Sequence, residues 1–163
     1  ARVHPHAISH GYVPGAAPSA FRDEFDWTGT TDPTALLALP ECLRYVGSLV
    51  PGGWDAIRAR NRTLALEARA LLCESLGVAM PCPDSMIGAI ASIPLPRVAD
   101  ASPLAVLDRV ELADLVRARG IEAWFHPWAC AGGKVLRISA QLYNEPHEYA
   151  ALAVLLRELA DVR

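Results

Sequence analysis

The segment LRISAQLYNE, at positions 136–145, places an arginine in a run that otherwise has the pattern of a half-buried strand. Because side chains alternate between the two faces of a strand, Leu136 and Ile138 are predicted on one face and Arg137 on the other. Two interpretations follow. Arg137 either lies on a solvated sheet face, as in most such strands, or binds an anion, because its planar guanidinium suits bidentate recognition of a carboxylate.

A second candidate site is WTGTTD, at positions 27–32, where hydroxyl side chains and a glycine precede a predicted helix. Backbone N–H groups and the helix dipole favour an anion at such a position, and a threonine hydroxyl can add a directional hydrogen bond to a phosphate. Thr and Asp residues also cap helices in many proteins that bind no ligand there. On spacing alone, ordinary helix capping is the favoured interpretation of this segment.

Three histidines near the N-terminus, His4, His6 and His10, would share one face of an unbroken strand. Three imidazoles can bind a catalytic zinc ion. Positions 4 and 10 of a strand, however, lie about 20 Å apart, which is too far for one ion unless the chain turns. The sequence therefore assigns no metal site.

Two nucleophilic side chains, Cys130 and Lys134, lie within the glycine-rich segment WACAGGK. No neighbouring residue activates the Cys130 thiol, which favours an inert cysteine. Lys134 is the only lysine of the chain, so any chemistry that needs an amine has one candidate. The four cysteines form no C-x-x-C pair, and this spacing predicts reduced thiols rather than a zinc or dithiol site.

The composition narrows the classes of partner. The chain has 163 residues, of which 52% are hydrophobic, and a formal net charge of −3. Its basic residues are scattered and offer no positive patch for nucleic acid. No apolar run reaches the roughly 20 residues that span a bilayer, and the N-terminus lacks the layout of a secretory signal. We therefore expect a cytoplasmic protein without a nucleic-acid or membrane partner.

The first third of the chain does not complete a folding unit. Asp32 and Pro33 have the pattern of an N-cap and a first helical residue, and a helix is predicted from there to Val50, kinked or split at Pro40. The sequence PGG at 51–53 ends that helix and resembles a joint between units. A strand end, a loop and one kinked helix cannot bury a core. Residues 1–51 are therefore predicted to be the end of a larger domain.

The remainder, residues 52–163, is predicted to fold as one small α+β domain. A long helix is expected from Trp54 to Leu76, closed by Gly77, with a solvated polar face that includes Arg69. A strand in SMIGAIASIPLP, a helix from Ser102 to Gly120, two strands around the segment WACAGGK and a last helix capped by Asn144 follow. This order predicts an α/β layer with a mixed or antiparallel sheet and helices on one side.

Several motifs, taken in order, resemble one enzyme family. They include HPHAISHGY, FDWTGTTDPTALLALPECLRYVGSLVPGGW, RNRTLALEARALLCESLG, CPDSMIGAIASIPLP, RGIEAWFHPW and LRISAQLYNEPHEY. Together they are similar to the C-terminal part of class V aminotransferase-fold enzymes, of the isopenicillin N epimerase-like branch. The resemblance covers nearly the whole chain and implies the fold of type I pyridoxal 5'-phosphate (PLP)-dependent transferases, with PLP as cofactor in a homodimer.

The resemblance also implies roles for four residues. The Gly29–Thr30 pair matches the pair that contacts the cofactor phosphate of the neighbouring subunit, and His10 matches a position near the cofactor. Arg137 opens the R-x-S-x-x-x-Y-N strand and matches the arginine that binds the substrate α-carboxylate. The family's PLP-binding lysine lies upstream of all these motifs, so Lys134 is not given that role, and the chain is expected to be inactive alone.

The reaction stays open at this point. The resemblance implies an amino-acid substrate and is compatible with epimerisation, transamination or elimination. Cysteine desulfurases are an alternative, with Cys130 near the position of their reactive cysteine but without the flanking R-x-G-H-H. An alternative from another class is a non-catalytic dimerisation or interaction domain that keeps the fold.

Overall fold

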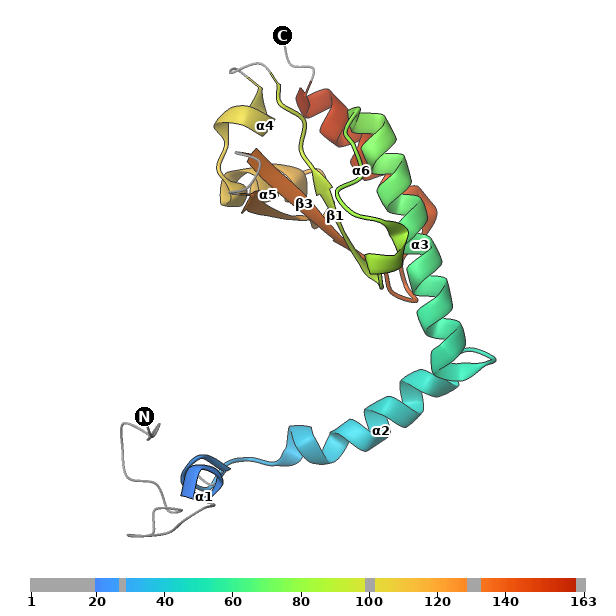
Figure 1. Ribbon diagram of the computed structural model, residues 1–163, viewed down its shortest axis with the longest axis vertical. Helices are drawn as coiled ribbons and strands as arrows, with labels where there is room; N and C mark the ends of the chain where they lie inside the picture. Colours follow the sequence, from blue (N-terminus) through green and yellow to red (C-terminus); the bar gives the residue numbers. More distant parts are fainter. Residues whose placement is uncertain (1–19, 27–28, 99–101, 129–132, 161–163) are drawn as a thin grey trace. The chain divides into compact units, whose positions relative to one another are not determined.

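The computed structural model in Figure 1 describes residues 20–26, 29–98, 102–128 and 133–160. The chain divides into two compact units, Ala1–Tyr45 and Val46–Arg163. This division lies before the predicted boundary after residue 51. The assignment of the two units to a large and a small domain stays a prediction.

The described part of the first unit is helical. Helix α1 (Ala20–Asp26), which the sequence reasoning did not predict, is stabilised by an ion pair between Arg22 and Asp26 and by stacked rings of Phe21 and Phe25, whose centroids are 4.6 Å apart. It precedes the cap of the next helix.

Helix α2 (Thr34–Ser48) begins as predicted, because Asp32 Oδ1 accepts a hydrogen bond from the backbone N–H of Thr34 at 2.9 Å. Pro40 lies inside α2 without splitting it, since the loss of one backbone donor leaves the neighbouring turns intact. None of the α2 side chains is buried.

The long helix α3 (Gly53–Leu76) opens the second unit and confirms the predicted helix there. Gly52 at its start and Gly77 at its end adopt left-handed backbone conformations, with φ of 88° and 65°. One prediction for α3 was wrong: Arg69 is only 1% exposed instead of lying on a solvated face. Its guanidinium donates to the Cys82 carbonyl at 2.9 Å and pairs with the Asp84 carboxylate, which ties the following loop to the helix.

Three strands form an antiparallel sheet in the order β1–β3–β2. Strands β1 and β3 are labelled in Figure 1. Strand β1 (Ile90–Pro94) follows a 3-10 turn, η1 (Asp84–Met86), and pairs with β3 (Gly133–Ser139), which in turn pairs with β2 (Trp124–Trp128). Alternate residues of β3 separate as predicted, with Leu136 and Ile138 buried and Arg137 exposed. We call the face that carries Leu136 the closed face and the face that carries Arg137 the open face.

The closed face is covered by helices, which confirms the predicted α+β class. Leu136, Ile93 and Phe125 of the three strands belong to one hydrophobic core with side chains from α3, α5 (Arg109–Arg117) and α6 (Pro146–Ala160). Helices α3 and α6 lie side by side in Figure 1. The open face has no comparable cover among the described residues.

The predicted single helix from Ser102 to Gly120 is two helices in the structure. Ser102 caps the short α4 (Pro103–Val106) as expected, but Leu107 is extended and Asp108 starts α5 with a capping box completed by Glu111. The sequence Asp-x-x-Glu carries that signal, and the prediction overlooked it.

Within the described ranges, no helix is both long and apolar enough to cross a bilayer. The cytoplasmic location expected from the sequence stays a prediction.

Candidate active site

Arg137 lies near the middle of β3 on the open face of the sheet. In the strand register it stands opposite Ser92 of β1 and opposite Trp124 of β2. Among the residues that the structure describes, no hydrogen bond or ion pair engages its guanidinium. A guanidinium exposed in this way retains all its donors for an external anion.

A cleft of about 560 Å³ adjoins Arg137 at one end of the sheet. It exists because β2 begins at Trp124, opposite Arg137, so that the last residues of β3, Ile138 and Ser139, extend beyond their neighbour strand. The segment 120–124, the turn after β3 and the first turns of α6 form the other walls.

Tyr149 of α6 lines this cleft and is buried. Its hydroxyl donates to the Ser139 carbonyl at 2.7 Å, at the part of β3 that β2 does not reach. Burial is the main cause that raises the pKa of the Tyr149 hydroxyl, and the charge of Glu148 raises it further. Tyr149 therefore stays protonated at neutral pH and acts as a hydrogen-bond donor that fixes the strand end.

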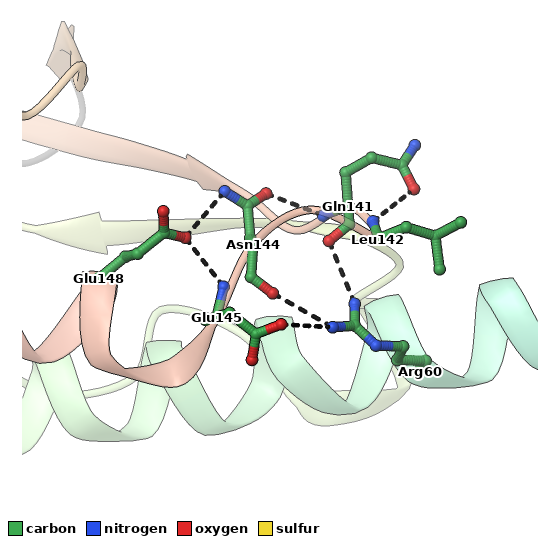
Figure 2. A network of polar contacts seen from close by, with 6 residues as sticks. All are labelled: Arg60, Gln141, Leu142, Asn144, Glu145 and Glu148. Atoms are coloured by element: carbon green, nitrogen blue, oxygen red, sulfur yellow. Dashed lines mark hydrogen bonds and ion pairs between the residues drawn. The ribbon is translucent and has the colours of Figure 1, made fainter.

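A network of polar contacts holds the turn that follows β3 (Figure 2). Arg60 of α3 donates to the carbonyls of Gln141 at 3.2 Å and Asn144 at 3.3 Å, and it reaches the Glu145 carboxylate at 3.4 Å. Asn61 adds a bond to the Gln141 side chain at 2.8 Å. Helix α3 thereby fixes the turn that carries Tyr143 into the cleft.

The start of α6 is organised by Glu148 rather than by Asn144, so the predicted Asn144 cap was wrong. The Asn144 side-chain oxygen accepts from the Gln141 N–H at 3.0 Å and closes the turn instead. Glu148 accepts from the Glu145 N–H at 2.8 Å and from the Asn144 side chain at 3.2 Å. Both hydrogen bonds lower the pKa of the Glu148 carboxyl, and the bond from the Glu145 backbone has the larger effect. Glu148 is therefore ionised at neutral pH.

Gly29 and Thr30, the predicted phosphate contacts, belong to the first unit and are described separately from Arg137. Gly29 has a φ of 142°, a backbone conformation that residues other than glycine rarely adopt, and Thr30 is exposed. The neighbouring Asp32 carboxylate is engaged by Thr34, whose side-chain and backbone hydrogen bonds lower the pKa of Asp32. The capping role is therefore taken by Asp32, and no hydrogen bond with the described residues engages the Thr30 hydroxyl.

Lys134 is held away from the cleft beside Arg137. Its ammonium group donates to the carbonyls of Leu104 at 2.9 Å and Ala105 at 3.0 Å, at the end of the short helix α4. This engagement agrees with the expectation that Lys134 does not bind the cofactor.

Several other candidates named from the sequence lie outside the described residues. His10, which the resemblance places near the cofactor, is one of them, as are His4, His6 and Cys130. In the part of the chain that the structure covers, no three potential ligands gather for a metal ion. Burial raises the pKa of the Cys73 thiol, so that cysteine is an unreactive core residue.

Sequence reasoning missed two contributors to the cleft, Trp124 and Arg60. In the sequence Trp124 has the pattern of an ordinary strand residue. Only its pairing with Arg137 in the β2–β3 register shows that the two side chains are neighbours. Arg60 lies 81 positions from Gln141 in the sequence, so no local pattern connects them.

Comparisons with known proteins support the resemblance. The chain is 35% identical over 170 residues to isopenicillin N epimerase of Streptomyces clavuligerus, a match that covers 96% of this chain and 40% of that protein. It is 30% identical over 161 residues to a probable chloroplastic L-cysteine desulfhydrase of Arabidopsis thaliana, with coverages of 93% and 32%. A putative L-cysteine desulfhydrase of Oryza sativa subsp. japonica is 28% identical, with coverages of 97% and 34%.

No family model matches the sequence. The chain spans between about a third and two fifths of the length of the relatives that it matches. The resemblance predicted from FDWTGTTD and RISAQLYN is confirmed by these relatives.

Proposed function

Because the chain is homologous to class V aminotransferase-like PLP enzymes, we propose that it forms the C-terminal part of such an enzyme, which acts on an amino acid as a homodimer. In this proposal residues 1–51 are the end of the cofactor-binding domain and residues 52–163 are the small domain. The favoured reaction is isopenicillin N epimerase-like epimerisation or transamination.

The observation that carries the proposal is the state of Arg137. Its guanidinium projects from the open face, has no partner among the described residues and borders a cleft of about 560 Å³. Arginine bound to a carboxylate makes two parallel charge-assisted hydrogen bonds, which fix the orientation of the ligand as well as its position. Arg137 would thereby hold the α-carboxylate of an amino acid and orient its Cα.

The residues of the first unit fit the phosphate of PLP. The exposed Thr30 hydroxyl is a free donor among the described residues, and the backbone at Gly29 takes a conformation open to close approach, since a Cβ there would meet nothing within 4 Å. We assign these two residues, together with His10, to cofactor binding. When bound, PLP withdraws electrons from the Cα of an amino acid, and this chain contributes the contacts that hold the cofactor and the substrate.

Substitution of Arg137 tests the proposal in the full-length protein that carries this chain. We expect Arg137→Ala to lower kcat/KM for its amino-acid substrate on the order of 100-fold or more, because a charge-assisted, bidentate contact is lost. Arg137→Lys should recover only part of that loss, since an ammonium group cannot reproduce the planar fork. PLP content, measured from cofactor absorbance, should not change.

Arg109→Ala is the matched control, because Arg109 is also exposed and lies on α5 outside the cleft. Equal kinetics for Arg137→Ala and the unmodified protein would remove Arg137 from the site. An equal loss in Arg109→Ala would point to a general effect of charge rather than to a carboxylate contact.

A second candidate reaction is removal of sulfur from cysteine, either as free sulfide in a desulfhydrase-like lyase or as a persulfide on an enzyme cysteine in a desulfurase-like lyase. The observation in its favour is that two of the relatives described above bear the name L-cysteine desulfhydrase. The two reactions differ in product. Sulfide release from L-cysteine would support the lyase, whereas conversion of one stereoisomer into the other, followed by chiral chromatography, would support the epimerase.

The non-catalytic alternative, an interaction domain that keeps this fold, makes a different prediction. Borohydride reduction of the full-length protein in the presence of PLP should label one lysine if the protein is an enzyme of this class. Lys134 should not be that lysine, because its amine is engaged by the α4 carbonyls. Absence of any specific label would favour the interaction domain.

A further inference from the structure

Two exposed aromatic side chains border the cleft beside Arg137. Trp124 at the start of β2 is 52% exposed, and Tyr143 in the turn after β3 is 79% exposed. They come from separate segments of the chain, and both line the same cleft as Arg137. Large aromatic surfaces left open beside a free cation are typical of ligand-binding sites rather than of a solvated sheet face.

Trp124 has a defined position relative to Arg137. The two residues are directly opposite each other in the β2–β3 register, and on the same face of an antiparallel pair such residues lie about 4.5–5.5 Å apart at Cβ. On its other side Arg137 faces Ser92, a small polar residue. A ligand held by the guanidinium is therefore flanked by an indole on one side only.

The turn that carries Tyr143 is held in place before any ligand binds. Arg60 binds the carbonyls of Gln141 and Asn144, the residues two before and one after Tyr143. The Asn144 side chain closes the same turn through the Gln141 N–H. The second aromatic wall of the cleft is thus preorganised, which lowers the entropic cost of ligand binding.

We propose that the cleft selects amino acids with a large, mainly apolar side chain, which packs against Trp124 and Tyr143 while Arg137 holds the α-carboxylate. This inference rests on the proposed function of Arg137. A volume of about 560 Å³ lies in the range of sites for ligands much larger than cysteine. A small side chain fixed at Arg137 leaves the aromatic surface exposed, whereas a large one covers it and gains the free energy of apolar burial.

Polar side chains also line the cleft, among them Ser139, Asn144 and Glu148. Glu122 and His147 are exposed and line the cleft from the segment before β2 and from the first turn of α6. They can accommodate a polar group on the ligand side chain. The selected class therefore includes large, mainly apolar side chains that also carry a polar group.

The test uses the full-length protein and a series of L-amino acids of increasing side-chain size, namely alanine, cysteine, norleucine and phenylalanine. Equilibrium binding by calorimetry and, where turnover occurs, kcat/KM are measured for each. We expect affinity to rise along the series. In Trp124→Ala the affinity for norleucine and phenylalanine should fall about tenfold or more, while that for alanine should change less than about threefold.

Trp54→Ala is the matched control, since Trp54 is a partly exposed indole on α3 that does not line the cleft. It should leave the order of affinities unchanged. Tyr143→Phe should also preserve the order, because the inference assigns the Tyr143 ring, and not its hydroxyl, to packing. Tyr143→Ala should reduce binding of the large amino acids selectively.

The outcomes separate this inference from the proposed function. If Arg137→Ala abolishes binding of every amino acid but Trp124→Ala weakens alanine and phenylalanine equally, the inferred selectivity is wrong and the carboxylate contact stands. Tighter binding of cysteine than of norleucine and phenylalanine would also overturn the inferred selectivity. The proposed function itself fails if the Arg137→Ala variant binds all four amino acids as tightly as the unmodified protein does. It also fails if the unmodified protein binds none of the four amino acids.

Discussion

The two faces of strand β3 have opposite properties although their residues alternate along one segment. On the closed face Leu136 is fully buried and Ile138 is 5% exposed, within a core shared with α3, α5 and α6. On the open face Arg137 is exposed, and its guanidinium has no partner among the described residues. The fold depends on one face of the strand, and the proposed chemistry depends on the other.

This separation explains why a pattern of alternating residues could not settle the role of Arg137. Alternation requires only that one face be apolar, and a solvated arginine satisfies it as well as a ligand-binding one. The distinguishing features, the short β2 and the cleft at its end, come from the register of strands that are distant in the sequence.

Among the substitutions that test this comparison, Leu136→Ala is expected to change the free energy of unfolding the most. Loss of a large side chain from a packed core costs about 2–5 kcal/mol, which is a substantial part of the 5–15 kcal/mol that stabilises a typical domain. Urea unfolding followed by circular dichroism would measure it. Arg137→Ala, one position along, should change the free energy of unfolding by less than about 0.5 kcal/mol, because it removes an exposed side chain.

Equal destabilisation by the two substitutions would break the comparison, since it would mean that Arg137 packs in the core of the assembled protein. Destabilisation by Leu136→Ala alone, together with the kinetic loss expected for Arg137→Ala, would establish that stability and function are carried by opposite faces.

Much of the fold followed from the sequence because its signals are local. Gly77 ends α3, Ser102 caps α4, and the alternation in β3 identifies its buried face, each within a few residues of the feature it specifies. The predictions that were wrong have two sources. The split between α4 and α5 was also signalled locally, by Asp108 and Glu111, and was overlooked.

The burial of Arg69 and the cleft at Arg137 belong to the second source, which is tertiary structure. Arg69 has a polar side chain at a position that the helical period places near the core, and its partners, Cys82 and Asp84, lie in a loop whose path no local pattern gives. The resemblance named Arg137, Gly29 and Thr30, but the neighbours of Arg137 became evident only from strand register.

A smaller effect is expected from Arg60→Met, which cuts the connection between the closed-face helix α3 and the turn beside the open face. Arg60 makes three contacts with that turn, at 3.2–3.4 Å, but its side chain is 38% exposed, so the loss of stability should be about 1 kcal/mol. Binding of large amino acids should weaken more than binding of alanine, because Tyr143 is no longer held.

Calorimetric titration with alanine and phenylalanine, beside urea unfolding, measures both quantities in the same variant. Arg58→Met provides the control, since Arg58 pairs with Asp55 at the start of the same helix and, among the described residues, makes no hydrogen bond or ion pair with the turn. Unchanged selectivity in Arg60→Met would show that the turn keeps its conformation without α3.

The smallest effect is expected from Glu148, whose carboxylate joins the start of α6 to the turn. Its folded pKa is lowered by the hydrogen bonds from the Glu145 N–H and the Asn144 side chain. Its contribution to stability is therefore complete above the unfolded pKa of about 4.5 and is lost as the pH falls through the lower folded value.

Because Glu148 is exposed, its contribution to stability should be below about 1 kcal/mol. Glu148→Gln should therefore lower stability slightly at pH 7 and flatten its decline as the pH falls below about 4.5. Glu67→Gln is the control, because Glu67 is an exposed carboxylate on α3 that makes no hydrogen bond among the described residues. It should change neither the stability at pH 7 nor the decline of stability at acid pH. An unchanged decline at acid pH in Glu148→Gln would mean that the turn beside the open face is held without the Glu148 carboxylate.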